Sequence, residues 1–117
     1  MELKIIHFYP DLMSLYGSYA NVSVLRRYLE ALGCAVTVQP VVPGEGADIT
    51  GAGFLFMGAG TERAQRFAAE DFARYSATVK AAAEDGTAML FAGTAMELLG
   101  ASVTDRDGDT YPGLGLA

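Results

Sequence analysis

Short apolar runs alternate with stretches of helical periodicity along this chain. The apolar runs predict four buried strands, at Leu3 to Phe8, Ala35 to Val42, Gly53 to Met57 and Ala88 to Phe91. Apolar residues at helical spacing predict one helix from Ser18 or Asn21 to Leu32 and a long helix from about Glu62 to Glu84. Gly33 and Gly86 follow these helices where C-terminal caps are expected. The alternation predicts βαβ units and a parallel sheet.

The apolar positions also predict which helix faces are buried. They are Val22, Leu25, Leu29 and Leu32 in the first helix, and Ala68, Phe72, Tyr75, Val79 and Ala82 in the second. Beyond Gly100, a strand at Ser102 to Thr104, a turn at Asp105 to Asp109 and a returning segment from Tyr111 predict a hairpin. We therefore expect one α/β domain over residues 1–117. Its fold would be a flavodoxin-like three-layer sandwich of about four parallel strands with flanking helices and a hairpin-like extension at the C-terminal end.

In open parallel sheets, ligands bind at the carboxyl ends of the strands. This rule places Phe8 with Tyr9, Gly58 to Gly60 and Ala92 to Thr94 on one rim, and Cys34 on the opposite rim. Ala88 to Gly100 has the strand, sharp turn and helix start of a nucleophile elbow, in which backbone N–H groups face an anion. No residue of this turn is a ready nucleophile.

Composition narrows the class of protein. With 117 residues, of which 51% are hydrophobic, the chain is long and apolar enough to bury the core of one domain. The net charge of −6 argues against nucleic acid as a partner. Membrane insertion is not expected, because no apolar run approaches the ~20 residues that span a bilayer. Met1-Glu-Leu-Lys lacks a signal-peptide layout, which favours a cytoplasmic protein. The single cysteine, Cys34, excludes an internal disulfide and a cysteine-only metal cage.

Several motifs along the whole chain match one family. They are His7-Phe-Tyr-Pro-Asp-Leu-Met-Ser-Leu-Tyr-Gly17, Asn21-Val22 with Leu25-Arg-Arg-Tyr-Leu29, Phe54-Leu-Phe-Met-Gly-Ala-Gly60 with Gln65, Met96-Glu-Leu-Leu-Gly100, and Asp107-Gly108 through Pro112-Gly-Leu-Gly-Leu116. The sequence resembles the class I glutamine amidotransferases of the cobyric acid synthase type, and especially the glutaminase subunits of lipid II isoglutaminyl synthases. The resemblance implies the front half of the family fold.

The resemblance also implies an activity and a partner. Family members hydrolyse glutamine with an elbow cysteine and pass ammonia to a partner that activates a carboxyl group, here a Mur-ligase-like or other synthase subunit. No cofactor and no metal are implied. The family elbow reads Cys-Gly-Gly-Tyr-Gln-Leu-Leu-Gly, which places the cysteine position on Gly93, or on Ala92 with one inserted residue. Glu97 replaces the family glutamine, and Ala59 replaces a glycine that usually belongs to the oxyanion turn.

The catalytic histidine of the family falls beyond the position of Ala117, and the only histidine here is His7. We therefore expect a degenerate, non-catalytic domain that acts as a binding or partner subunit. Its predicted binding residues are Asp11, Gly58, Ala59, Gly60 and Glu97. For Asp11, a binding role and simple loop capping are equally favoured.

For the other reactive side chains, structural roles are favoured over chemical ones. Thr94 lacks an adjacent base, so an N-cap role is favoured over a nucleophile. His7 and Cys34 are expected to be structural residues, His7 in the core or at the rim and Cys34 buried, and Glu97 a solvated helix residue. Asp105, Asp107 and Asp109 have calcium-like spacing but lack the closing glutamate, which favours a hairpin turn.

Two alternatives to the non-catalytic subunit stay open. In the first alternative, the chain is part of a split or truncated protein that is completed by another chain or by homodimerisation through an unpaired sheet edge. In the second alternative, the chain is a small anion-binding module that uses the Gly58–Gly60 and Gly93 turns. A dinucleotide fingerprint is excluded because Arg63 occupies its third glycine position, and no P-loop Gly-Lys pair is present.

Overall fold

A computed structural model describes residues 2–13, 18–44, 46–91, 95, 98, 102–104, 108 and 110–113. Its elements in chain order are β1 (Glu2–Phe8), α1 (Ser18–Ala31), β2 (Ala35–Val41), β3 (Phe54–Met57), α2 (Glu62–Phe72), the 3₁₀ turn η1 (Ala73–Tyr75), α3 (Ser76–Glu84), β4 (Ala88–Phe91), β5 (Ser102–Thr104) and β6 (Thr110–Pro112). The predicted alternation of strands and helices is confirmed. Gly33 and Gly86, at φ +95° and +82°, adopt the left-handed conformation that ends the helices before them.

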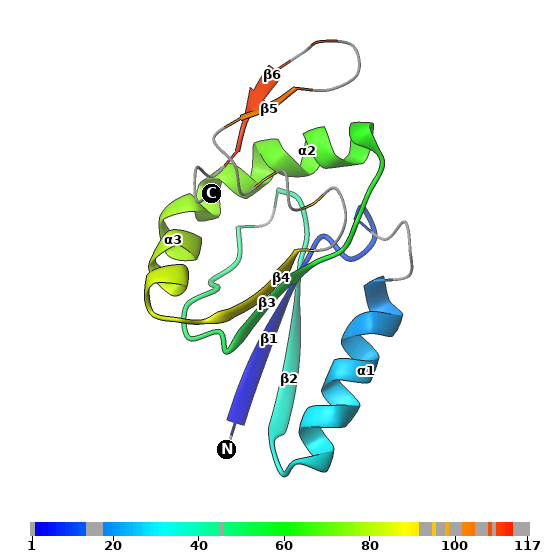
Figure 1. The fold of residues 1–117 in the computed structure, drawn as a ribbon, viewed down its shortest axis with the longest axis vertical. Helices are drawn as coiled ribbons and strands as arrows, with labels where there is room; N and C mark the ends of the chain where they lie inside the picture. Colours follow the sequence, from blue (N-terminus) through cyan, green and yellow to red (C-terminus); the bar gives the residue numbers. More distant parts are fainter. Residues whose placement is uncertain are drawn as a thin grey trace.

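β1 to β4 form one parallel sheet in the order β2-β1-β3-β4 (Figure 1). α1 covers one face of this sheet, while α2, η1 and α3 cover the other. The flavodoxin-like α/β prediction is therefore confirmed. β5 and β6 pair antiparallel beyond the sheet, with β6 against α2, which agrees with the predicted hairpin.

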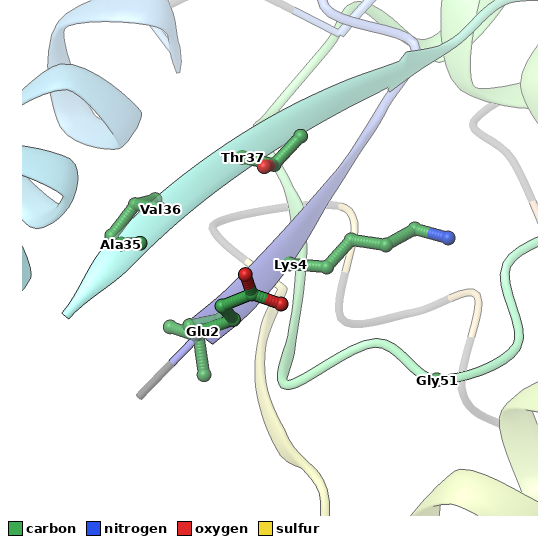
Figure 2. A pocket seen from close by; sticks show the side chains of 7 residues that line it. Glu2, Lys4, Ala35, Val36, Thr37 and Gly51 are labelled. Carbon is green, nitrogen blue, oxygen red and sulfur yellow. The ribbon is translucent and has the colours of Figure 1, made fainter.

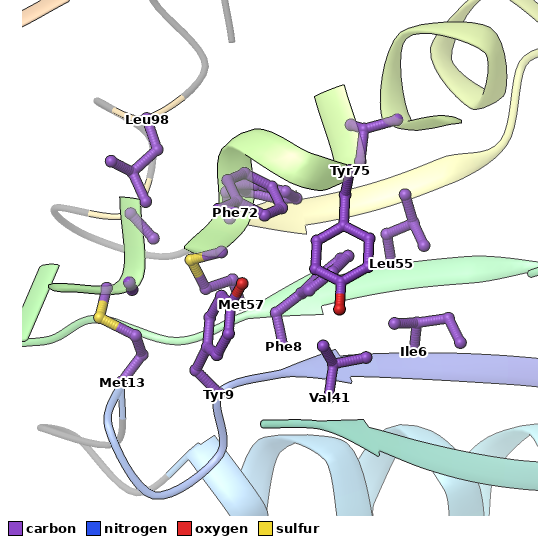
Figure 3. Close-up of a cluster of buried hydrophobic side chains, with 14 of the residues drawn as sticks. Ile6, Phe8, Tyr9, Met13, Val41, Leu55, Met57, Phe72, Tyr75 and Leu98 are labelled. Carbon is purple, nitrogen blue, oxygen red and sulfur yellow. The ribbon is translucent and has the colours of Figure 1, made fainter. Parts of the chain in front are cut away.

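Alternate residues of β1 enter two separate cores, as strand geometry requires. Ile5 packs on the α1 side with Val22, Val36 and Phe56. Ile6 and Phe8 point to the other face, into the larger core under α2 and α3 (Figure 3). That core gathers aromatic rings, with Phe8 edge-on to Phe72 and the Tyr75 ring 5.7 Å from the Phe8 ring. Both faces of β1 are therefore buried, as its continuous apolar run predicts.

The prediction of one long helix from Glu62 to Glu84 was wrong in its middle, where the 3₁₀ turn η1 separates α2 from α3. Phe72 and Tyr75 are 1% and 3% exposed, so both rings have to face the sheet. They are three residues apart, and side chains at this spacing share one face of an α-helix and eclipse in a 3₁₀ turn. The apolar spacing is therefore compatible with either geometry and does not reveal the 3₁₀ turn.

Two expectations of burial were also wrong. β4, predicted as a buried strand, lies at an end of the sheet order, where Ala88 is exposed and Leu90 is 50% exposed. Leu32, predicted on the buried face of the first helix, lies beyond the end of α1 and is 64% exposed. In both cases the apolar pattern indicates the element correctly but does not reveal where the neighbouring layer ends.

Among the described residues, no helix combines the length and the apolar character needed to cross a membrane.

Candidate functional site at the carboxyl ends of the strands

The order of the strands reverses between β1 and β3, because β2 lies on one side of β1 and β3 lies on the other. Sheets of this kind bind ligands where the order reverses, outside the carboxyl ends of the strands. Two turns leave the sheet at this point, Tyr9–Met13 after β1 and Gly58–Thr61 after β3. The structure therefore brings together two of the three predicted rim segments.

The two turns contact each other at Gly60. A Cβ atom built on Gly60 would lie 2.5 Å from Met13 Sδ and 3.3 Å from the Leu12 carbonyl oxygen. Met13 is itself fully buried, so it has little freedom to move away. A side chain at position 60 would therefore have to displace the end of the buried Met13 side chain.

The predicted oxyanion turn leads directly into the N-terminus of α2. Gly58 and Gly60 are buried and Ala59 is 5% exposed. Thr61 is the N-cap, and its Oγ1 accepts a hydrogen bond of 3.2 Å from the Ala64 N–H. The positive end of the α2 dipole thus lies beside the turn, where it favours a negatively charged group.

Tyr9 begins the other turn in a strained conformation. Its φ of +51° is left-handed, which costs a non-glycine residue about 1–2 kcal/mol. Three hydrogen bonds hold it there. The N–H donates to the Val41 carbonyl at 2.7 Å, the carbonyl accepts from the Met13 N–H at 2.8 Å, and the hydroxyl donates to Asp71 Oδ2 at 2.6 Å. Burial, together with the Asp71 carboxylate, raises the pKa of Tyr9 far above its usual 10.0, so the hydroxyl remains a donor.

Asp71 on α2 connects three parts of the chain. Besides the Tyr9 hydroxyl, its carboxylate accepts a 2.9 Å hydrogen bond from the Gly44 N–H and lies 3.1 Å from the Arg74 guanidinium. The Asp71 side chain is only 8% exposed, so these partners compensate for its loss of water. Sequence reasoning did not predict this site, because Tyr9 and Asp71 are 62 positions apart and no local pattern joins them.

His7 is the second-to-last residue of β1, close to this rim, and is 1% exposed. Its ring is edge-on to Phe56, with centroids 5.2 Å apart. Burial lowers the pKa of His7 to about 4, although the Asp11 carboxylate acts in the opposite direction. The imidazole is therefore neutral at pH 7, in agreement with the structural role predicted for it.

A cavity of about 370 Å³ opens beside the Tyr9 turn and lies between that turn and the residues that follow β2. Its lining residues are Tyr9, Pro10, Asp11, Leu12, Val42 and Pro43. Asp11 is exposed, on the rim where the sequence placed it. A second cavity, of about 410 Å³, lies at the amino ends of β1 and β2 next to Glu2, Lys4 and Thr37 (Figure 2). Since ligands bind at the carboxyl ends of parallel strands, we place the candidate site at the first rim.

The remaining predicted site residues fall into two groups. Cys34 lies at the opposite rim, where it is half-buried against the core under α1. The elbow residues Ala92, Gly93 and Thr94, together with Glu97, lie outside the described residues, as do Asp105, Asp107 and Asp109. Within the described part of the chain, no three His, Cys, Asp or Glu side chains are grouped so that they could hold a metal ion.

Two curated relatives match this chain along nearly all of its length. The chain is 30% identical over 115 residues to the GatD subunit of lipid II isoglutaminyl synthase (glutamine-hydrolyzing) from Staphylococcus aureus (strain N315), a match that covers 98% of this chain and 47% of that subunit. It is also 30% identical over 116 residues to GatD from Streptococcus pneumoniae (strain ATCC BAA-255 / R6), covering 98% of this chain and 44% of the relative. These matches support a glutamine amidotransferase-like relationship. The chain spans about half the length of these relatives, and no protein-family model matches it.

Proposed function

We propose that this chain is a glutamine amidotransferase-like domain that binds glutamine at the carboxyl rim of its sheet without hydrolysing it. One observation carries the proposal: similarity to GatD extends over 98% of the chain, in a fold whose strand order reverses beside the Gly58–Gly60 turn. The names of these relatives include glutamine hydrolysis and lipid II. We therefore propose cell-wall precursor amidation as the process, with a cytoplasmic Mur-ligase-like or other synthase subunit as the partner.

The proposed site consists of the two contacting turns and the elbow. The backbone N–H groups of Gly58, Ala59 and Gly60 would receive the polarised carbonyl oxygen of the glutamine amide, aided by the dipole of α2. Asp11 would bind the ligand from the first turn, and Glu97 from the segment after the elbow. Because Ala92 and Gly93 occupy the position of the family cysteine, neither side chain can attack the amide carbon.

Ammonia release and glutamine binding test this proposal together. We expect the purified chain to bind L-glutamine in a calorimetric titration and to release no ammonia in a coupled glutaminase assay. Thr94→Ala is the informative variant, because Thr94 carries the only hydroxyl in the elbow turn Ala92–Ala95. Ammonia release that disappears in Thr94→Ala would contradict the non-catalytic role, and absence of glutamine binding would contradict the binding role.

A second candidate function is supported by the edge of the sheet. β4 is paired with β3 on one side, and Leu90 is 50% exposed on it, so this edge offers backbone groups and apolar surface to another strand. We infer, as the alternative, that a further polypeptide or a second copy completes the sheet and the site. Light scattering of the wild-type chain and of Leu90→Lys separates this role from that of an isolated binding domain.

A further inference from the structure

Both ends of the turn Tyr9–Met13 make contacts with α2 or with the residue that precedes its N-cap. At its start, the Tyr9 hydroxyl donates to Asp71 on α2. At its end, Met13 lies against Gly60, the residue before the Thr61 N-cap of α2. Figure 3 shows Tyr9 and Met13 at the two sides of this turn. Because α2 joins Gly60 to Asp71, the contacts form a closed ring.

Hydrogen bonds and an ion pair hold the remaining members of this closed set of contacts. Inside the turn, the Met13 N–H donates to the Tyr9 carbonyl at 2.8 Å. The Asp71 carboxylate is itself fixed by the Gly44 N–H at 2.9 Å and by Arg74 at 3.1 Å. These bonds connect the Tyr9 hydroxyl to the contact between Met13 and Gly60.

We propose that Tyr9 is a positioning residue: through Asp71 it holds the first turn on Gly60 and so sets the direction of the Gly58–Gly60 amides. This inference rests on the proposed function for the role of those amides in receiving glutamine. The ring of Tyr9 packs in the core with Phe8 and Phe72, and a phenylalanine would keep that packing. The hydroxyl adds the hydrogen bond to Asp71, which helps to keep Tyr9 in its left-handed conformation at φ +51°.

Tyr9→Phe tests the role of the hydroxyl, with Tyr28→Phe as the matched control because Tyr28 is 64% exposed on α1. The first measurement is the amide chemical shifts of Gly58, Ala59 and Gly60 in ¹⁵N-labelled protein without ligand. We expect all three to move in Tyr9→Phe and to stay in place in Tyr28→Phe. Asp71→Asn keeps one of the two acceptor oxygens and should move these amides less than Asp71→Leu, which should reproduce the shifts of Tyr9→Phe.

The second measurement is the affinity for L-glutamine. If the amides are misaligned, L-glutamine binding should weaken by up to about tenfold in Tyr9→Phe, the scale of one lost hydrogen bond to a neutral carbonyl oxygen. Combining Tyr9→Phe with Asp71→Leu should add little further loss, since both changes break the same contact.

The two measurements separate the two proposals. Wild-type protein that does not bind glutamine would refute the proposed function, while the glycine amide shifts would still decide the role of Tyr9. Unmoved amides in Tyr9→Phe would overturn the positioning role. So would a loss of global stability alone, with the amide shifts of Gly58 to Gly60 and the glutamine affinity unchanged. If Tyr9→Phe does not fold, the contrast between Asp71→Asn and Asp71→Leu decides the question in the same way.

Discussion

The rings of Phe8 and Phe72 meet edge to face with their centroids 5.0 Å apart, and so join the central strand β1 to α2. Phe72 also lies 5.8 Å from the Phe91 ring on β4. Removal of this ring should therefore weaken the packing of α2 on both strands. We expect Phe72→Ala to lower the free energy of unfolding by about 3–5 kcal/mol. This is a large part of the total free energy of unfolding of a domain of this size. Chemical denaturation measures this loss.

Phe67→Ala on the same helix is the matched control. Phe67 is 56% exposed, so its truncation removes few packed contacts and should change the free energy of unfolding by less than about 1 kcal/mol. Equal losses in the two variants would contradict the assignment of Phe72 to the core.

His7 predicts a dependence of stability on pH. Its pKa is about 4 in the folded chain, against 6.5 for an ordinary histidine, so between these values the unfolded state binds more protons. The free energy of unfolding should therefore fall as the pH decreases from about 6.5 to about 4, by at most about 1.4 kcal/mol per pH unit from this group. Denaturation curves across this range measure the slope.

His7→Gln removes the only histidine of the chain, so any slope that remains in this variant belongs to other groups. We expect the variant to show a flatter profile than wild type between pH 4 and pH 6.5. Parallel profiles would show that His7 titrates normally and is not shielded from water.

The close approach of Met13 to Gly60 predicts that Gly60→Ala lowers the stability of the chain and its affinity for glutamine. The new methyl group would meet Met13 Sδ at 2.5 Å, and we expect a loss of about 1–3 kcal/mol in the free energy of unfolding. Met13→Ala is destabilising by itself because Met13 is fully buried, but it removes the opposing sulfur atom, so the double variant should lose less than the sum of the two single losses. Thermal or chemical denaturation of the single and double variants measures the coupling.

Gly53→Ala serves as the control for the location of that effect. Its new methyl group would meet the side chain of Leu3, at the amino end of β3 and away from the candidate site. Gly53→Ala should therefore leave glutamine binding unchanged, whereas Gly60→Ala should weaken it. Equal weakening by the two variants would mean that the Gly58–Gly60 turn has no special part in binding.

The exposed edge at β4 predicts a concentration-dependent association if another strand completes the sheet. Light scattering should then find dimers in wild-type protein and monomers in Leu90→Lys, since a charge on an edge strand opposes pairing. Leu32→Lys changes a residue of similar exposure beyond α1 and should leave the association unchanged. A monomer at all concentrations would exclude the second copy as the partner.

Much of the fold could be predicted from local pattern. The apolar run Ala88 to Phe91 indicates β4 with correct bounds, and the spacing of Phe72, Tyr75 and Val79 indicates their buried face. The sequence did not indicate that, among the described strands, β4 pairs with β3 alone, because burial of a strand depends on elements that its own residues do not encode.

The candidate site could be predicted only in part. The rule for parallel sheets places Phe8 with Tyr9 and Gly58 to Gly60 on one rim, as observed. The hydrogen bond between Tyr9 and Asp71 is not predictable in this way, since it depends on how α2 packs across the sheet. The strained φ of Tyr9 is equally hidden, because a tyrosine carries no local signal for a left-handed conformation.

A titration of the ¹⁵N-labelled chain with L-glutamine tests the central claim most directly, with L-asparagine as the control ligand. We predict saturable shifts of the Gly58, Ala59 and Gly60 amides with glutamine, weaker shifts with asparagine, and no release of ammonia during the experiment. Saturable shifts confined to the opposite rim, around Lys4 and Thr37, or no saturable shift at any amide, would contradict the account.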